Sequence, residues 1–278
     1  MLNVNAFPLV LYAVAGVLYA VHFATRNTTV GRSATATLAS GALAHTFVIG
    51  MQTMEAGHVP IAGTTQAIST FVWLLALAYL YVEMTTEERA LGVFIVPLMV
   101  ALQFIRALSP VVERRVPVLE SPWFGVHVAS LLFAYASFAL ACVIGITYVL
   151  LFKEIKAKHL GFFYARLPSL DSLDLMNART VTIGWLFLTV GVLVGTIWAT
   201  QAKGGPIVDP RVQAMSIADP KILGAAVCWA VYSFALYARR LGWGGKRAAY
   251  LSALGFAIVL FNFVPIGYFL TRSHNFGG

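Results

Sequence analysis

The chain has 278 residues, of which 59% are hydrophobic and only 11% are charged, and its mean hydropathy is +0.81. A soluble domain carries roughly a quarter charged residues, so this chain lacks the polar surface that a protein in water needs. The formal net charge of +8 does not indicate a nucleic-acid partner, because the basic residues are scattered at the ends of apolar segments, where they serve as membrane anchors. The composition therefore predicts an integral membrane protein.

Eight apolar segments follow one another along the chain, each close to the ~20 residues that a helix needs to cross ~30 Å of hydrocarbon. They span residues 6–25, 34–54, 65–83, 90–108, 122–152, 180–200, 222–240 and 249–271. A strand of a membrane barrel alternates apolar and polar residues over about ten positions, whereas residues 249–270 are apolar on every face. We therefore predict an all-α bundle of about eight transmembrane helices, which forms one polytopic domain over residues 1–278.

Basic residues indicate the orientation of the bundle. The connections after the first, third, fifth and seventh segments hold twelve of the 19 lysines and arginines, and the other side holds seven. By the positive-inside rule the side with twelve faces the cytoplasm, which puts both termini on the outer, periplasmic side. The first segment is expected to be a retained helix, because it lacks the basic start and the cleavage site of a signal peptide.

The histidines differ in their predicted depth. In this topology His58, His127 and His274 lie at the outer surface, whereas His45 lies inside the second segment. A single interfacial histidine is commonly just a hydrogen-bonded polar residue, but three on one face beside aromatic loops make ligation of a metal or a haem iron a hypothesis to test. For His45 two interpretations stay open: contact with haem or a quinone, or a neutral imidazole hydrogen-bonded to a neighbouring helix.

An outer connection rich in glycine and proline, residues 201–221, separates the sixth and seventh segments. Such an irregular backbone is tolerated because it lies at the water interface. Trp198 precedes this connection and Trp229 follows it. Both tryptophans suit an interfacial belt that anchors helices among lipid headgroups, and they equally suit an apolar platform for a planar ligand.

Several stretches, taken together, are similar to a known family. The sequence SPWFGVHVAS at 121–130, followed by AYASFALA at 134–141, resembles the CcsA/ResC-type cytochrome c assembly family. Further stretches agree in order and spacing. They are GHVP at 57–60, Trp198, Asp219-Pro-Lys, GWGGKRAA at 242–249 and SHNF at 273–276. The resemblance covers residues 35–276, and the motifs are specific jointly rather than singly.

The resemblance implies a haem-handling protein. In the family, two outer histidines that flank a tryptophan-rich loop supply the axial ligands of haem iron, and His127 and His274 occupy the matching positions. Trp198 and Asp219 match the two ends of that loop. His45 and His58 are further candidate cofactor-binding residues, for haem movement within the membrane or for loop structure, although neither matches a known ligand. The expected cofactor is haem b, and no catalytic residue is predicted.

The chain also departs from the family pattern. The dense run of tryptophans before Asp-Pro-Lys is replaced by Ser216-Ile-Ala, the family's histidine near the inner end of the next helix is absent from 236–240, and a usual glutamate is Gln66. Each lost stacking contact would cost about 1 kcal/mol, by analogy with aromatic pairs. These departures from the family pattern indicate that haem handling is weakened, altered or lost.

Two functions follow from these features. In the first, the protein holds haem at the outer face of a bacterial inner membrane and presents it to the CxxCH thiols of apocytochrome c. A companion membrane assembly subunit is then needed, because the chain shows no reductant or thiol chaperone, and the protein is at most the haem-presenting part of a haem-attachment complex. Retention of His127 and His274 favours this function.

In the second, the bundle is a membrane subunit of a respiratory or electron-transfer complex that holds haem or a quinone or anchors partner subunits. The missing tryptophans favour this alternative. A regulatory or structural relative without haem is a third possibility. An ion transporter is disfavoured, because the spans contain almost no acidic residues with which to build a cation pathway.

Overall fold

The computed structural model describes residues 4–61, 64–109, 120–158, 161–204 and 218–262. Within these ranges every regular element is helical, as the sequence predicts. The helices are α1 (Ala6–Thr25), α2 (Thr28–Ala56), α3 (Thr64–Thr86), α4 (Gly92–Leu108), α5 (Pro122–Lys156), α6 (Leu170–Gly204), α8 (Pro220–Arg240) and α9 (Lys246–Phe261). Six of them, α1, α2, α3, α5, α6 and α8, are long and apolar enough to cross a membrane. The chain is an all-α membrane bundle that crosses the membrane several times.

The largest difference from the predicted spans is at the start of α6. This helix begins at Leu170, ten residues before the expected start at 180. Its first turns are polar, so hydropathy alone predicts a connection there. Asp174 in these turns forms an ion pair of 2.8 Å with Arg239 at the end of α8. This partner makes a helical turn favourable at the water interface. The end of the predicted span 249–271 lies outside the described residues.

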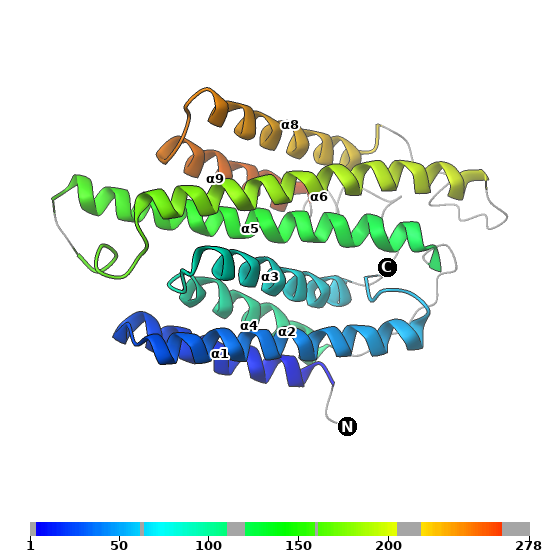
Figure 1. The fold of residues 1–278 in the computed structure, drawn as a ribbon. Coiled ribbons are helices and arrows are strands. Elements are labelled where there is room, and N and C mark those ends of the chain that lie inside the picture. Colours follow the sequence, from blue (N-terminus) through cyan, green and yellow to red (C-terminus); the bar gives the residue numbers. More distant parts are fainter. Residues whose placement is uncertain (1–3, 62–63, 110–119, 159–160, 205–217, 263–278) are drawn as a thin grey trace.

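Successive helices run in alternating directions, so their ends form two groups (Figure 1). One group contains the connections that follow α1, α3, α5 and α8, and we call it the basic end. The other group contains the starts of α3, α5 and α8, and we call it the His127 end. The connections predicted to share a side therefore do so. Which end faces the outside of the membrane stays a prediction.

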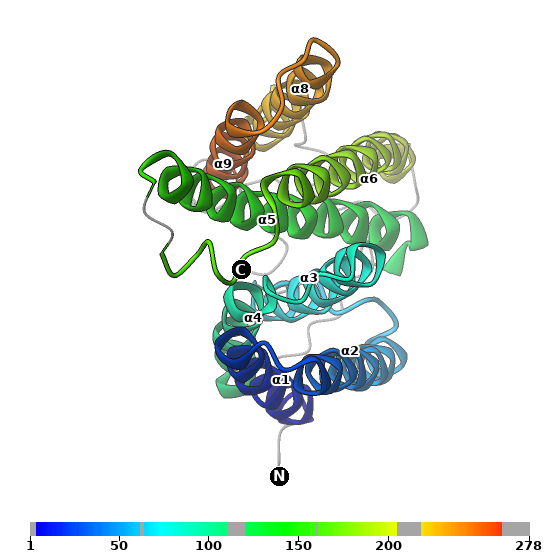
Figure 2. The same cartoon turned by 60° about the vertical axis from the view of Figure 1, so that its left-hand side comes forward.

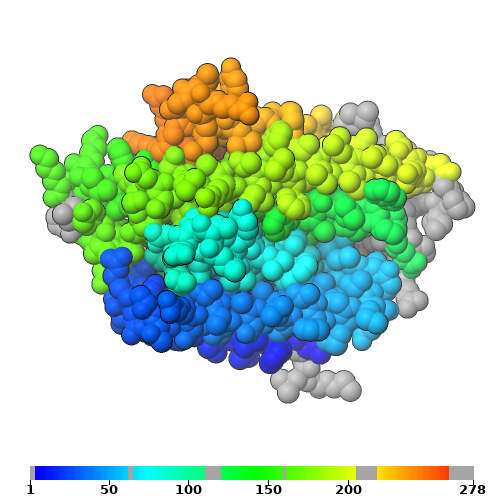
Figure 3. All heavy atoms as spheres, in the orientation of Figure 1, coloured from blue at the N-terminus to red at the C-terminus, as the bar shows by residue number. Residues whose placement is uncertain are grey.

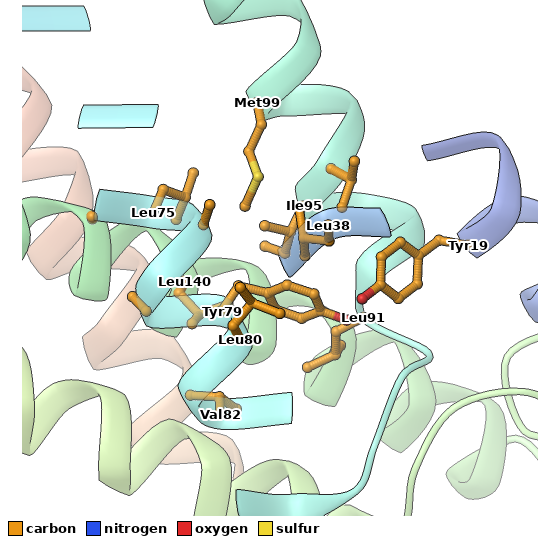
Figure 4. Close-up of a cluster of buried hydrophobic side chains, with 14 of the residues drawn as sticks. Tyr19, Leu38, Leu75, Tyr79, Leu80, Val82, Leu91, Ile95, Met99 and Leu140 are labelled. Atoms are coloured by element: carbon orange, nitrogen blue, oxygen red, sulfur yellow. The ribbon is translucent and has the colours of Figure 1, made fainter. Parts of the chain in front are cut away.

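Two buried clusters divide the bundle, with α5 between them (Figure 2). The first cluster joins α1–α4 to α5 and to the first turns of α6, and it includes Tyr19, Tyr79 and Met99 (Figure 4). The second joins α5 to α6, α8 and α9, and in it Phe138 stacks on Tyr232 with ring centroids 3.5 Å apart. Because α5 contributes to both clusters, its position depends on both halves of the bundle.

Large apolar side chains cover the outside of the helices as well as the interior. Phe47 on α2 is 74% exposed and Leu193 on α6 is 60% exposed. In the space-filling view α6 lies as a band between α8 on one side and α3 and α5 on the other (Figure 3). Such exposure would be costly in water, but lipid tails accept it at no cost. The surface therefore fits a lipid environment.

Candidate functional site

His127 is held against α6 by a backbone hydrogen bond. It lies in the second turn of α5, which begins at Pro122, and its Nδ1 is 2.7 Å from the carbonyl oxygen of Gly191. A carbonyl can only accept, so Nδ1 carries the proton and Nε2 keeps its lone pair. Ligating histidines commonly donate their second ring nitrogen to a carbonyl in this way. The imidazole is therefore in the tautomer that coordination of an iron by Nε2 requires.

Two glycines let α6 approach His127. A side-chain carbon at Gly195 would collide with the imidazole ring, and one at Gly191 would lie only 2.8 Å from Leu131 Cδ2. The two glycines are four residues apart and face α5 together, in the close-packing arrangement typical of membrane helices. They therefore fix both the space for the His127 ring and its hydrogen-bond acceptor.

Trp198 lies one turn after Gly195 and also faces α5. It is 4% exposed, and its ring centroid is 4.9 Å from that of Phe124, which is 6.5 Å from the His127 ring. The structure thus brings the predicted residues Trp198 and His127 together. Because Phe124 packs on the indole, Trp198 is a buried wall beside His127 rather than an open platform.

Asp219 has a clear local role at the start of α8. Its side chain accepts a hydrogen bond of 2.9 Å from the backbone nitrogen of Lys221, and Pro220 occupies the first helical position. An acidic N-cap followed by proline is a favourable way to begin a helix. The Asp-Pro-Lys motif therefore positions the start of α8 at the His127 end, and cofactor binding by Asp219 itself stays a prediction.

His58 carries a buried ring nitrogen without a hydrogen-bond partner. The residue follows the end of α2, is 8% exposed, and its Nδ1 lies 2.9 Å from the carbonyl oxygen of Val59. Nδ1 is therefore the donor, and the lone pair of Nε2 meets no hydrogen-bond donor among the described residues. An unpaired buried acceptor costs about 1–3 kcal/mol. Val59 Cγ2 lies 3.7 Å from a side-chain carbon built on Gly125 of α5, so this histidine adjoins the same end of α5 as His127.

Arg106 belongs to this end of the bundle, although no sequence motif singles it out. It is 1% exposed, in the last turn of α4, and its Nε and Nη1 have no hydrogen-bond partner in the described part of the chain. The signal was available: an arginine inside the span 90–108. Basic residues at span ends are so common as interfacial anchors that this one did not stand out.

His45 is fully buried and uses both ring nitrogens. Tyr12 Oη lies 3.1 Å from Nδ1, and Nε2 lies 2.9 Å from Ser69 Oγ. Ser69 donates its own hydroxyl proton to Gln103 Oε1 at 3.2 Å. Ser69 Oγ therefore accepts a hydrogen bond from His45 Nε2, and His45 Nδ1 accepts one from the Tyr12 hydroxyl. This chain of bonds favours the neutral, structural interpretation of His45. Contact with a cofactor stays a prediction, and it would require one of these bonds to be exchanged.

His274 lies outside the described residues, so its distance from His127 is not part of this geometry. A cleft of about 230 Å³ with a charged lining lies at the basic end, at the opposite end of the bundle from His127. Its lining comprises His22, Phe23, Arg26, Thr28, Glu87, Glu88, Arg89, Ala90 and Arg166. Of the described imidazoles at the His127 end, that of His58 is buried and that of His127 is half-buried.

Comparison with known proteins adds an independent finding. A family model described as "Cytochrome C assembly protein" matches residues 3–276. The chain is 26% identical over 253 residues to the cytochrome c biogenesis protein CcsA of Guillardia theta, covering 84% of this chain and 81% of that protein. It is 28% identical over 255 residues to the protein of the same name from Heterosigma akashiwo, covering 78% and 76%. With that of Parasynechococcus marenigrum it shares 24% over 250 residues, covering 80% and 79%.

Proposed function

The chain belongs to the cytochrome c assembly protein family, and from this premise we propose that it holds haem b at the outer face of a bacterial inner membrane for delivery to apocytochrome c. The observation that carries the proposal is the His127 imidazole, whose Nδ1 donates to Gly191 and whose Nε2 keeps its lone pair. His274, which the family resemblance pairs with His127, is the proposed second axial ligand.

The residues at the His127 end fit such a cofactor. His127 and His58 both direct a proton to a carbonyl through Nδ1, so each keeps an Nε2 lone pair suited to iron. Trp198 and Phe124 form an apolar wall beside them. When bound, haem supplies the vinyl groups that accept the thiols of an apocytochrome CxxCH motif, while the protein supplies ligation and orientation.

Delivery also requires reduced iron and free thiols, which we assign to a companion membrane assembly subunit. The two cysteines, Cys142 and Cys228, lie within α5 and α8 and are partly or fully buried, which suits a packing role rather than thiol exchange. The proposed protein is therefore the haem-presenting part of a larger complex.

One observation favours the alternative function, a membrane subunit of a respiratory or electron-transfer complex. Trp198 is packed on Phe124 and nearly buried, so the described indole does not offer the open platform that haem presentation uses. A site of this kind would retain haem between its ligands, and electron transfer then becomes its chemistry in place of delivery.

The reduced-minus-oxidised absorption spectrum and the pyridine haemochrome of the purified protein test the proposal. Wild type is expected to carry haem b, and His127→Ala and His274→Ala are each expected to lose it. His159→Ala, on the predicted cytoplasmic side, is the matched control and should keep it. A wild-type protein that stays haem-free when haem is supplied would contradict the proposed function.

A further inference from the structure

Arg106 is a buried cation that lacks a counter-charge among the described residues. The inward face of α4 consists of Gly92, Ile95, Val96, Met99, Gln103 and Arg106. The arginine therefore continues a buried stripe into the bundle instead of turning to the headgroups. Burying a guanidinium without an anion is expensive, and an unpaired buried donor adds to the cost. A residue placed in this way indicates a binding partner outside the described residues.

Described contacts connect the segment around Arg106 to the one that contains His58. Gln103, one turn earlier on α4, accepts a hydrogen bond of 3.2 Å from Ser69 on α3. The next residue, Thr70, donates to the carbonyl oxygen of Pro60 at 3.0 Å. Pro60 is two residues from His58, whose buried Nε2 also lacks a partner in the described structure. Two unsatisfied groups, one a donor and one a lone pair, thus lie on directly connected segments.

The chemistry of the two groups restricts the ligand. A guanidinium presents planar N–H donors that match a carboxylate or phosphate, and an imidazole Nε2 matches a metal. Since no described acidic residue pairs with Arg106, we assign the compensating negative charge to the ligand. Haem is a largely apolar ring that carries both an iron and carboxylate groups. We propose that Arg106 binds a propionate carboxylate of the haem coordinated at the His127 end, an inference that rests on the proposed function.

A titration with two probes tests this contact. Haem and haem dimethyl ester have the same iron and ring, but the ester lacks the charged carboxylates. Wild type should bind haem about tenfold to 100-fold more tightly than the ester, the range expected for a hydrogen bond to a charged group. Arg106→Gln should lose that preference by weakening haem binding while leaving the affinity for the ester unchanged. Arg106→Lys should restore part of the preference.

A matched control and three contrary results make the test decisive. Arg32→Gln, an exposed arginine at the basic end, should keep the wild-type preference. Equal weakening of both probes in Arg106→Gln would overturn the proposal and indicate a structural role. A preference that persists in Arg106→Gln would assign the carboxylate to another residue.

The third contrary result concerns an anionic lipid, whose phosphate shares the chemistry of a carboxylate. Equal wild-type affinity for the two probes, with thermal stabilisation by phosphatidylglycerol vesicles that Arg106→Gln abolishes, would assign Arg106 to a lipid phosphate and overturn the proposal. Binding of neither probe by wild type would instead contradict the proposed function itself, so failure of the function and failure of the Arg106 contact are distinguishable.

Discussion

The ring of His127 occupies the space that a side chain at Gly195 would need. The same ring donates to the carbonyl of Gly191, one turn earlier on α6, at 2.7 Å. Helix packing and imidazole orientation are therefore one property of the α5–α6 contact. A change in the distance between α5 and α6 should alter the orientation of the His127 imidazole before it alters the rest of the bundle.

Substitution of Gly195 tests this connection. We expect Gly195→Ala to force the His127 ring away from Gly191, to lower haem content severalfold, and to reduce stability by about 1–3 kcal/mol through overpacking. The pyridine haemochrome and thermal unfolding in detergent measure the two effects. Gly50→Ala is the matched control, since a side-chain carbon there meets nothing within 4 Å, and it should be neutral or slightly stabilising. Unchanged haem content in Gly195→Ala would contradict the connection.

The unpaired Nε2 of His58 leads to a second prediction. If this lone pair contributes to the cofactor site, His58→Ala should reduce the haem retained after purification, and added imidazole should restore it by occupying the vacated space. The absorption spectrum with and without imidazole reports both steps. His22→Ala, at the basic end, should change neither value. Haem retention that is insensitive to the loss of His58 would assign this histidine to the local structure of the 57–60 segment.

The spans could be predicted from hydropathy because each is a long apolar run, and the described helices agree closely with them. The start of α6 could not be predicted in this way. The polar first turns of α6 contain Asp174, whose ion-pair partner Arg239 is 65 residues away along the chain, and no local pattern reveals such a partner. At the site, the motif around His127 was visible in the sequence. The tautomer of the His127 imidazole and the burial of Arg106 depend on neighbouring helices, so only the fold reveals them.

A buried carboxylate in the first cluster supports a third prediction. Tyr19 donates to Glu83 Oε2 at 2.6 Å, Thr35 donates to Oε1, and Arg89 Nε lies 3.7 Å from Oε1. Glu83→Gln should cost about 1–3 kcal/mol, because it leaves these donors with a poorer acceptor. Tyr19→Phe should cost about 1 kcal/mol, and the double variant should lose less than the sum if the two groups are coupled. Additive losses in unfolding measurements would refute the coupling.

Glu88, in the connection between α3 and α4, gives a pH dependence with a defined sign. Burial raises the pKa of its carboxyl group above the ordinary value of 4.5, and Arg26 and Arg89 only partly oppose this effect. The folded state therefore holds the proton more tightly than the unfolded state, so the contribution to stability falls as pH rises through the window that begins near 4.5. Glu88→Gln should flatten that slope in thermal melts across the window, whereas the exposed neighbour Glu87→Gln should preserve it. An unchanged slope in Glu88→Gln would assign the pH dependence to other groups.

The two interpretations of His45 make opposite predictions. Both ring nitrogens of His45 form hydrogen bonds, Nδ1 with Tyr12 Oη and Nε2 with Ser69 Oγ. If the role of His45 is structural, another side chain with one donor and one acceptor should partly replace it. We therefore expect His45→Gln to lose about 1–3 kcal/mol of stability, because the shorter amide forms the two buried hydrogen bonds less well. The haem spectrum should stay unchanged. His45→Leu should destabilise further, because Tyr12 and Ser69 both lose a partner. A changed haem spectrum in a folded His45→Gln protein would instead show that this histidine contacts the cofactor, and would place haem within the membrane as well as at its surface.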